Sequence, residues 1–74
     1  MMTKTAIVIA TSTRGGVLVG GNPPTPIVHQ REITDDFHNN QNRLIIGAAV
    51  ADAVEHAWKA GHDPTTITFK LRFE

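Results

Sequence analysis

The last part of the chain alternates between apolar and polar residues with great regularity. From Ile67 to Phe73 every second residue is large and apolar, and the residues between them are threonine, lysine and arginine. Successive side chains of a strand point to opposite faces, so this pattern predicts a strand over Thr65–Phe73 with one covered and one solvated face. A sheet with one covered face limits the domain to two layers.

The residues before this strand predict a helix that covers the sheet. Capping residues are frequent between Asp35 and Asn42, so the helix is expected to begin within this range. Gly61 is expected to end it in the left-handed conformation, and Pro64 prevents its continuation. A helical wheel predicts one broad apolar arc formed by Leu44, Ile46, Val50, Ala51, Ala53, Val54, Ala57 and Trp58.

Two positions of this helix lead to specific expectations. Trp58 is expected to be buried at the end of the helix, in which case truncation to alanine costs about 3–5 kcal/mol. Ile45 falls on the polar side of the wheel together with Asp52 and His56. Such an apolar residue is either covered by the proline-rich loop at 20–26 or forms a contact with a partner or a second copy.

The first half of the chain predicts three further strands. Thr5–Thr11 is β-branched and apolar on both faces, which is typical of a central strand. Turn residues and two glycines at 12–16 then predict a hairpin into a second strand at Val17–Val19. Glycines and prolines at 20–26 form a loop, and Ile27–Thr34 has the mixed polarity of an edge strand.

Together these elements predict an α+β fold in the order βββαβ, with one helix on one face of a four-stranded, mostly antiparallel sheet. The expected strand order is 3-2-1-4, and the last strand is expected to run parallel to the first through a right-handed crossover.

Size and composition narrow the function. A chain of 74 residues predicts a single domain over 1–74, and a domain this small buries only about 60% of its unfolded surface, which favours self-association or a partner. The formal net charge of zero disfavours nucleic acid as the main partner. The absence of cysteine fits a reducing compartment, so a cytoplasmic protein is expected, and no stretch is long enough to span a membrane.

The helix start resembles that of a known fold. The segment Asn-Asn-Gln-Asn-Arg-Leu at 39–44, the alanine-rich helix and Thr66–Leu71 are similar to the first half of ribonuclease H-like enzymes. That family holds two metal ions with carboxylates on the first strand, near the helix start and at the end of the fourth strand. Thr11–Thr13, Ile45 and Lys70–Arg72 stand at these positions, so the resemblance implies a truncated, non-catalytic relative. Small HicB-type antitoxins and phage-type inhibitors are similar at the level of the fold only.

The candidates for catalytic or metal chemistry are weak. His29, His38, His56 and His62 lack the spacing of metal ligands and are expected to be solvated or hydrogen-bonded surface residues. Ser12 has no histidine or acid placed beside it by the sequence, so no catalytic triad is expected. We expect no enzyme activity, no cofactor and no metal.

Basic residues offer a last candidate surface. Lys4, Arg14, Arg31, Lys70 and Arg72 can form a strip on the open sheet face, although a solvated face with edge-protecting charges is the simpler interpretation because no aromatic residues interleave.

The sequence therefore predicts a non-catalytic protein-binding module, an anti-CRISPR-like phage inhibitor or antitoxin-like regulator that occupies a surface of a larger nucleic-acid-processing machine. A nucleic-acid-binding protein is the alternative, and a homodimer through an edge strand is also considered. The candidate partner-binding residues are Arg14, Arg31, Ile45, Asp52, His56, Lys70 and Arg72.

Overall fold

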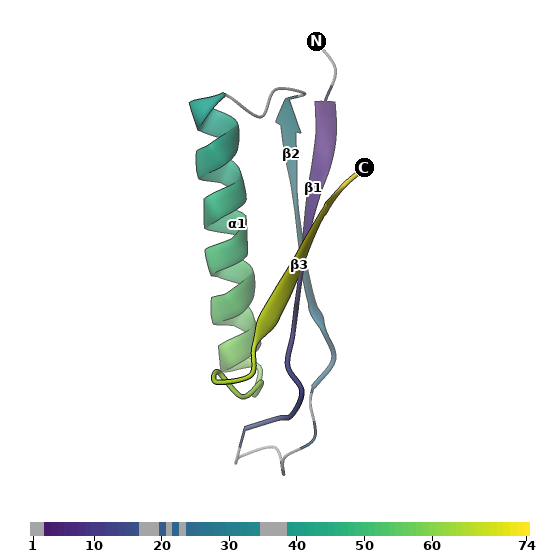
Figure 1. Ribbon diagram of the computed structural model, residues 1–74, viewed down its shortest axis with the longest axis vertical. Coiled ribbons are helices and arrows are strands. Elements are labelled where there is room, and N and C mark those ends of the chain that lie inside the picture. The colour runs from purple at the N-terminus through teal and green to yellow at the C-terminus, as the bar shows by residue number, and fades with distance from the viewer. Residues whose placement is uncertain (1–2, 17–19, 21, 23, 35–38) are drawn as a thin grey trace.

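The computed structural model describes residues 3–16, 20, 22, 24–34 and 39–74. Its elements are the strands β1 (Thr3–Thr11) and β2 (Ile27–Thr34), the helix α1 (Asn40–Lys59) and the strand β3 (Thr68–Phe73). The strands form a three-stranded sheet in the order β2-β1-β3, and α1 lies along one face of it (Figure 1). The α+β class and the single helix on a sheet are confirmed.

The predicted strand number and order are wrong. The predicted second strand at Val17–Val19 lies outside the described residues. Ile27–Thr34 was expected two strands away from the first strand, but it pairs directly with β1, with Ala6 opposite Arg31. The sheet among the described residues therefore has three strands, with β2 at one edge and β3 at the other.

The predicted parallel pairing of the first and last strands is also wrong, because β3 runs antiparallel to β1. The direction depends on how many times the chain reverses before the helix. One reversal separates β1 from β2, and the helix then returns the chain to the start of a strand that runs in the same direction as β2. The additional strand in the prediction added one reversal and so inverted the direction of the last strand.

Local capping determines both ends of α1. Asn39 is the N-cap, and its side-chain oxygen accepts hydrogen bonds from the backbone N–H groups of Gln41 at 2.8 Å and Asn42 at 3.3 Å. At the other end, the N–H of Gly61 bonds to the carbonyl of Trp58, and the N–H of His62 bonds to that of Ala57. This is a Schellman motif, and the φ of 101° at Gly61 confirms the predicted left-handed residue.

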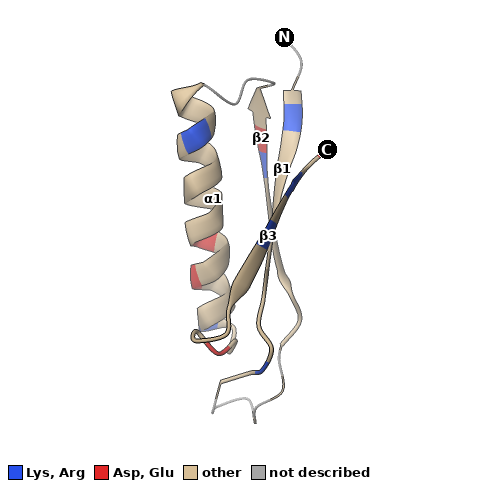
Figure 2. Ribbon diagram, in the orientation of Figure 1, with Lys and Arg blue, Asp and Glu red and all other residues tan. Residues whose placement is uncertain are grey.

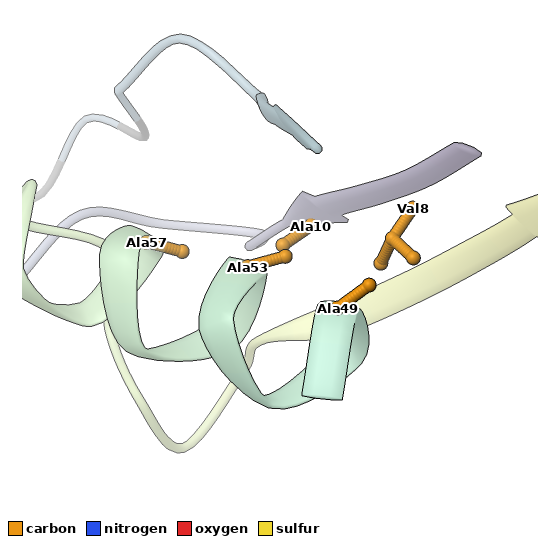
Figure 3. Close-up of a cluster of buried hydrophobic side chains, with 5 residues drawn as sticks. All are labelled: Val8, Ala10, Ala49, Ala53 and Ala57. Atoms are coloured by element: carbon orange, nitrogen blue, oxygen red, sulfur yellow. The ribbon is translucent and has the colours of Figure 1, made fainter. Parts of the chain in front are cut away.

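The buried core lies between β1 and α1. Val8 and Ala10 of β1 face Ala49, Ala53 and Ala57 of α1, and all five are buried (Figure 3). Alanine side chains let the helix backbone come close to the sheet, but they provide little apolar area to stabilise it.

The broad apolar arc is narrower than predicted. Trp58 is 62% exposed and Leu44 is 73% exposed, so neither belongs to the core. The expectation that Trp58 fills the end of the helix–sheet interface was wrong, because Ala49, Ala53 and Ala57 form the buried face of the helix and Trp58 lies beside that face.

The described helix is not long and apolar enough to cross a membrane.

The open face of the sheet is less polar than expected at its centre. Ile7 points away from α1 yet is only 4% exposed. Its neighbours across the sheet are Gln30 on β2 and Arg72 on β3, whose long side chains can lie over it. This arrangement agrees with the prediction that both faces of the first strand are at least partly covered.

Candidate protein-binding surface

The two flanks of α1 differ in chemistry. Residues of a helix are 100° apart, so Asp52 and Val54 project to opposite sides of the buried Ala53. The Asp52 side faces β2, because Asp52 pairs with Arg31 at 3.5 Å. The opposite flank therefore lies toward β3.

The β2 flank is polar. His56 of α1 and His29 of β2 are 3.1 Å apart between Nδ1 and Nε2, with their rings edge to face. One imidazole donates and the other accepts in this contact. On the solvent side of the helix, Lys59 forms an ion pair with Glu55 at 2.8 Å. Their hydrogen bond lowers the pKa of Glu55 and raises the pKa of Lys59.

Ile45 lies on the same flank, close to the helix start. It is half-buried and lines a shallow hollow with Ile33 and Thr34 of β2. The described part of the proline-rich loop lies at the other end of the helix, where the carbonyl of Thr25 contacts His62. Among the residues that the structure describes, Ile45 thus neighbours the end of β2 and not the loop.

Buried Asn42 connects the helix start to the end of β2. Its side-chain amide donates to the carbonyl and hydroxyl of Thr34 at 2.9 and 2.7 Å, and its oxygen accepts from the Thr34 N–H at 3.2 Å. These bonds satisfy backbone groups at the point where the strand pairing ends.

The opposite end of the molecule contains a contact that the sequence analysis did not expect. Ser12 Oγ lies 2.6 Å from His62 Nδ1, a contact that no sequence pattern had indicated. His62 is 1% exposed and its Nε2 lies 3.0 Å from the Thr25 carbonyl, so it is not the surface residue that was predicted. A carbonyl only accepts, so Nε2 carries a proton. The buried ring ties three segments together.

Asp63, the residue after His62, also connects separate segments of the chain. Asp63 forms an ion pair with Arg14 and accepts from the N–H and hydroxyl of Thr65 at 3.0 and 2.8 Å. The hydrogen bond from Arg14, followed by those from Thr65, holds the pKa of Asp63 below its ordinary value. Asp63 is therefore engaged with Arg14 and not with His62, and the three side chains of a catalytic triad are not connected.

The predicted basic strip is not assembled. Lys4 and Arg31 lie on the helix side of the sheet. Arg14 forms an ion pair with Asp63 beside the end of the helix. Lys70 and Arg72 do lie on the open face, where they neighbour Ile9 and Ile7 of β1. Figure 2 shows the lysines and arginines spread over the strands and the helix. Arg72 also pairs with Glu74 at 3.2 Å.

The seven candidate residues thus divide among three places. Arg31, Ile45, Asp52 and His56 gather between α1 and β2, Lys70 and Arg72 lie on the other face of β3, and Arg14 lies beside the helix end. His38 lies outside the described residues. Across the described ranges, no three or more histidine and acidic side chains come together in a way that could hold a metal ion.

The β3 side of the molecule carries a partly exposed apolar surface, in which Leu71 and Val50 also pack against the core. Phe69, Leu71 and Phe73 lie on the helix side of the sheet, because they pair with Ala10, Val8 and Ala6. No residue of β3 is fully buried, and Phe69 is 52% exposed. The helix flank on this side bears no charge between Arg43 and Lys59, and consists of Gly47, Val50, Ala51, Val54 and Trp58.

We call these eight residues the β3-side apolar surface. The strand alternation predicted that Phe69, Leu71 and Phe73 meet the helix, and Leu71 does pack against the core, but Phe69 is exposed. The sequence did not reveal that α1 lies over β1 and β2 and leaves β3 beside it.

No known protein family matches the chain, and comparisons with curated proteins and with solved structures found no significant match. The functional argument therefore depends on the chemistry of this surface.

Proposed function

We propose that the chain is a small non-catalytic protein-binding module. Its action is that of an anti-CRISPR-like phage inhibitor or antitoxin-like regulator, which occupies a surface of a larger nucleic-acid-processing machine. The observation that carries the binding function is the β3-side apolar surface, where Phe69 is 52% exposed and Trp58 62% exposed. Exposed aromatic residues are typical anchors of protein interfaces.

The dimensions of the chain support a binding function. The radius of gyration is 13.8 Å, whereas about 11 Å is typical of a compact domain of this length. The accessible surface is 5084 Å², about 600 Å² more than a monomer of 8.0 kDa usually exposes. Each partner in a standard protein interface contributes about 800 Å², so a single contact can cover an area of this order.

Quantitative affinity capture from host lysate tests the proposal. The wild-type chain is compared with a double variant, Trp58→Ser with Phe69→Thr, and with the control Leu44→Ser. Leu44 is a matched control because it is an exposed apolar residue on the side of α1 away from the sheet. Circular dichroism verifies that each variant retains the fold.

We expect a stoichiometric protein to be recovered with the wild type and with Leu44→Ser, and to be lost with the double variant. Recovery of no stoichiometric partner would contradict the proposed function. Equal recovery with the double variant would show that the partner does not use the aromatic residues.

The nucleic-acid alternative receives less support from this arrangement. Arg14 and Arg31 are each paired with an acid, and of the five basic residues of the predicted strip only Lys70 and Arg72 lie together on the open face. A shift of DNA or RNA at low salt that disappears with Lys70→Glu and Arg72→Glu would favour that alternative.

A further inference from the structure

The edge strand β3 presents two chemically different faces beside an open edge. Within the described residues, β3 pairs with β1 on one side only. Its outer side therefore offers backbone N–H and carbonyl groups to another strand. The chemistry of the two faces determines which strand fits there.

On the helix side, an added strand would meet apolar residues. Its side chains would extend the row of Phe69, Leu71 and Phe73 and would lie beside the uncharged flank of α1. Apolar side chains are favoured there, since they remove the exposed aromatic surface from water. Charged side chains would lose their solvation without gaining a partner.

On the open face, an added strand would meet positive charge. Lys70 and Arg72 are two of the three β3 residues on this face, and Glu74 balances only one of their two charges. Side chains directly opposite in neighbouring strands interact, and opposite charges are favoured. Acidic residues therefore fit this face.

The same two residues disfavour a second copy of the chain. A symmetric antiparallel pair centred on Leu71 would place Lys70 opposite Arg72 of the other copy, twice. A pair centred on Lys70 would place the two lysines opposite each other. Like charges directly opposite destabilise a strand pair, so in these two central registers the charges on β3 favour a foreign strand over self-association.

We propose that β3 binds an extended segment of a partner protein by strand addition, and that this segment alternates apolar residues toward α1 with acidic residues toward the open face. The inference rests on the proposed protein-binding function and names the kind of partner segment it would use. Main-chain hydrogen bonds would supply part of the affinity, and the two faces of β3 would supply the specificity.

Synthetic peptides test the proposal directly. β3 has six residues, so a probe of about seven residues, with valine and glutamate alternating and both ends blocked, spans the edge. Three controls isolate the contributions: lysine in place of glutamate, serine in place of valine, and N-methylated backbone amides that cannot pair. The chain contains a single tryptophan, Trp58, so its fluorescence reports occupation of the β3-side apolar surface.

We expect the glutamate peptide to bind roughly tenfold more tightly than the lysine peptide, as two favourable cross-strand charge pairs predict. The N-methylated and serine peptides should bind more weakly than the glutamate peptide. In the variant Lys70→Glu with Arg72→Glu, the preference should invert, so that the lysine peptide binds more tightly. This inversion also shows that the variant is folded.

Several results would overturn the proposal. These are no binding of the glutamate peptide at about 1 mM, equal binding of the charged peptides, or unchanged binding of the N-methylated peptide. Sedimentation showing a dimer that Lys70→Glu with Arg72→Glu alters would assign the edge to a second copy. A partner captured from lysate equally by wild type and this charge-reversed variant would retain the proposed function but reject strand addition to β3.

Discussion

Substitution of Val8 by alanine is the sharpest test of where the core lies. Val8 is fully buried between β1 and α1, next to Ala49. Removing its two methyl groups loses about 1.6 kcal/mol of transfer free energy. A residual cavity of about 50 Å³ adds about 1 kcal/mol, because the alanines around it cannot expand to fill it. The expected loss in the free energy of unfolding is therefore about 2–3 kcal/mol.

Val28→Ala is the matched control, since Val28 is also a strand valine but is 52% exposed. We expect its cost to remain below about 1 kcal/mol. Urea unfolding followed by circular dichroism measures both values, with the slope of the transition checking that each variant unfolds in the same way. A domain of this size is typically stable by roughly 4–11 kcal/mol, so the difference is measurable. Equal costs for the two valines would refute the assignment of the core to the β1–α1 contact.

Four other predictions follow from individual contacts. Trp58→Ala should cost about 1 kcal/mol in the same urea assay, far below the 3–5 kcal/mol expected of a buried tryptophan, and a loss above about 3 kcal/mol would show that Trp58 is in the core. Asn42→Ala should cost about 2–4 kcal/mol, because it leaves backbone groups of Thr34 without partners, and a cost near zero would mean that water replaces the side chain. Gly61→Ala should lower stability by about 1–2 kcal/mol, since alanine is strained at a φ of 101°, whereas a stabilised variant would contradict the left-handed helix end. The pKa of Asp63 is lowered in the folded protein, so its contribution to stability is present above the unfolded pKa of about 3.9 and is lost as the pH falls through the lower folded pKa. In acid titrations of the free energy of unfolding, Asp63→Asn should lose this part of the pH dependence. The same pH dependence in the variant and the wild type would refute the assignment.

Local sequence patterns correctly predicted where several helix and strand ends lie. The strand Ile27–Thr34 was predicted with the observed bounds, and the helix begins at Asn40, inside the predicted range. The helix end at Gly61 was also predicted correctly. These features depend on capping side chains, glycine conformation and residue alternation, which act over a few neighbouring residues.

Contacts between distant residues were not accessible in the same way. Ser12 and His62 are 50 positions apart, and no local pattern brings them together. The direction of β3 was predicted incorrectly because it depends on the total number of chain reversals. The exposure of Phe69 was also missed, since alternation shows that a strand has an apolar face but not what covers it.

The sequence by itself determined that this chain is an α+β domain with a capped, alanine-rich helix and a final strand with one apolar and one basic face. Only the tertiary structure decided that the helix packs over β1 and β2 and leaves β3 beside it. The physical reason is that close packing of small alanines aligns the helix with Val8 and Ala10 at the sheet centre. The helix covers β3 only in part, and Phe69 on its apolar face stays exposed for a partner in our proposal.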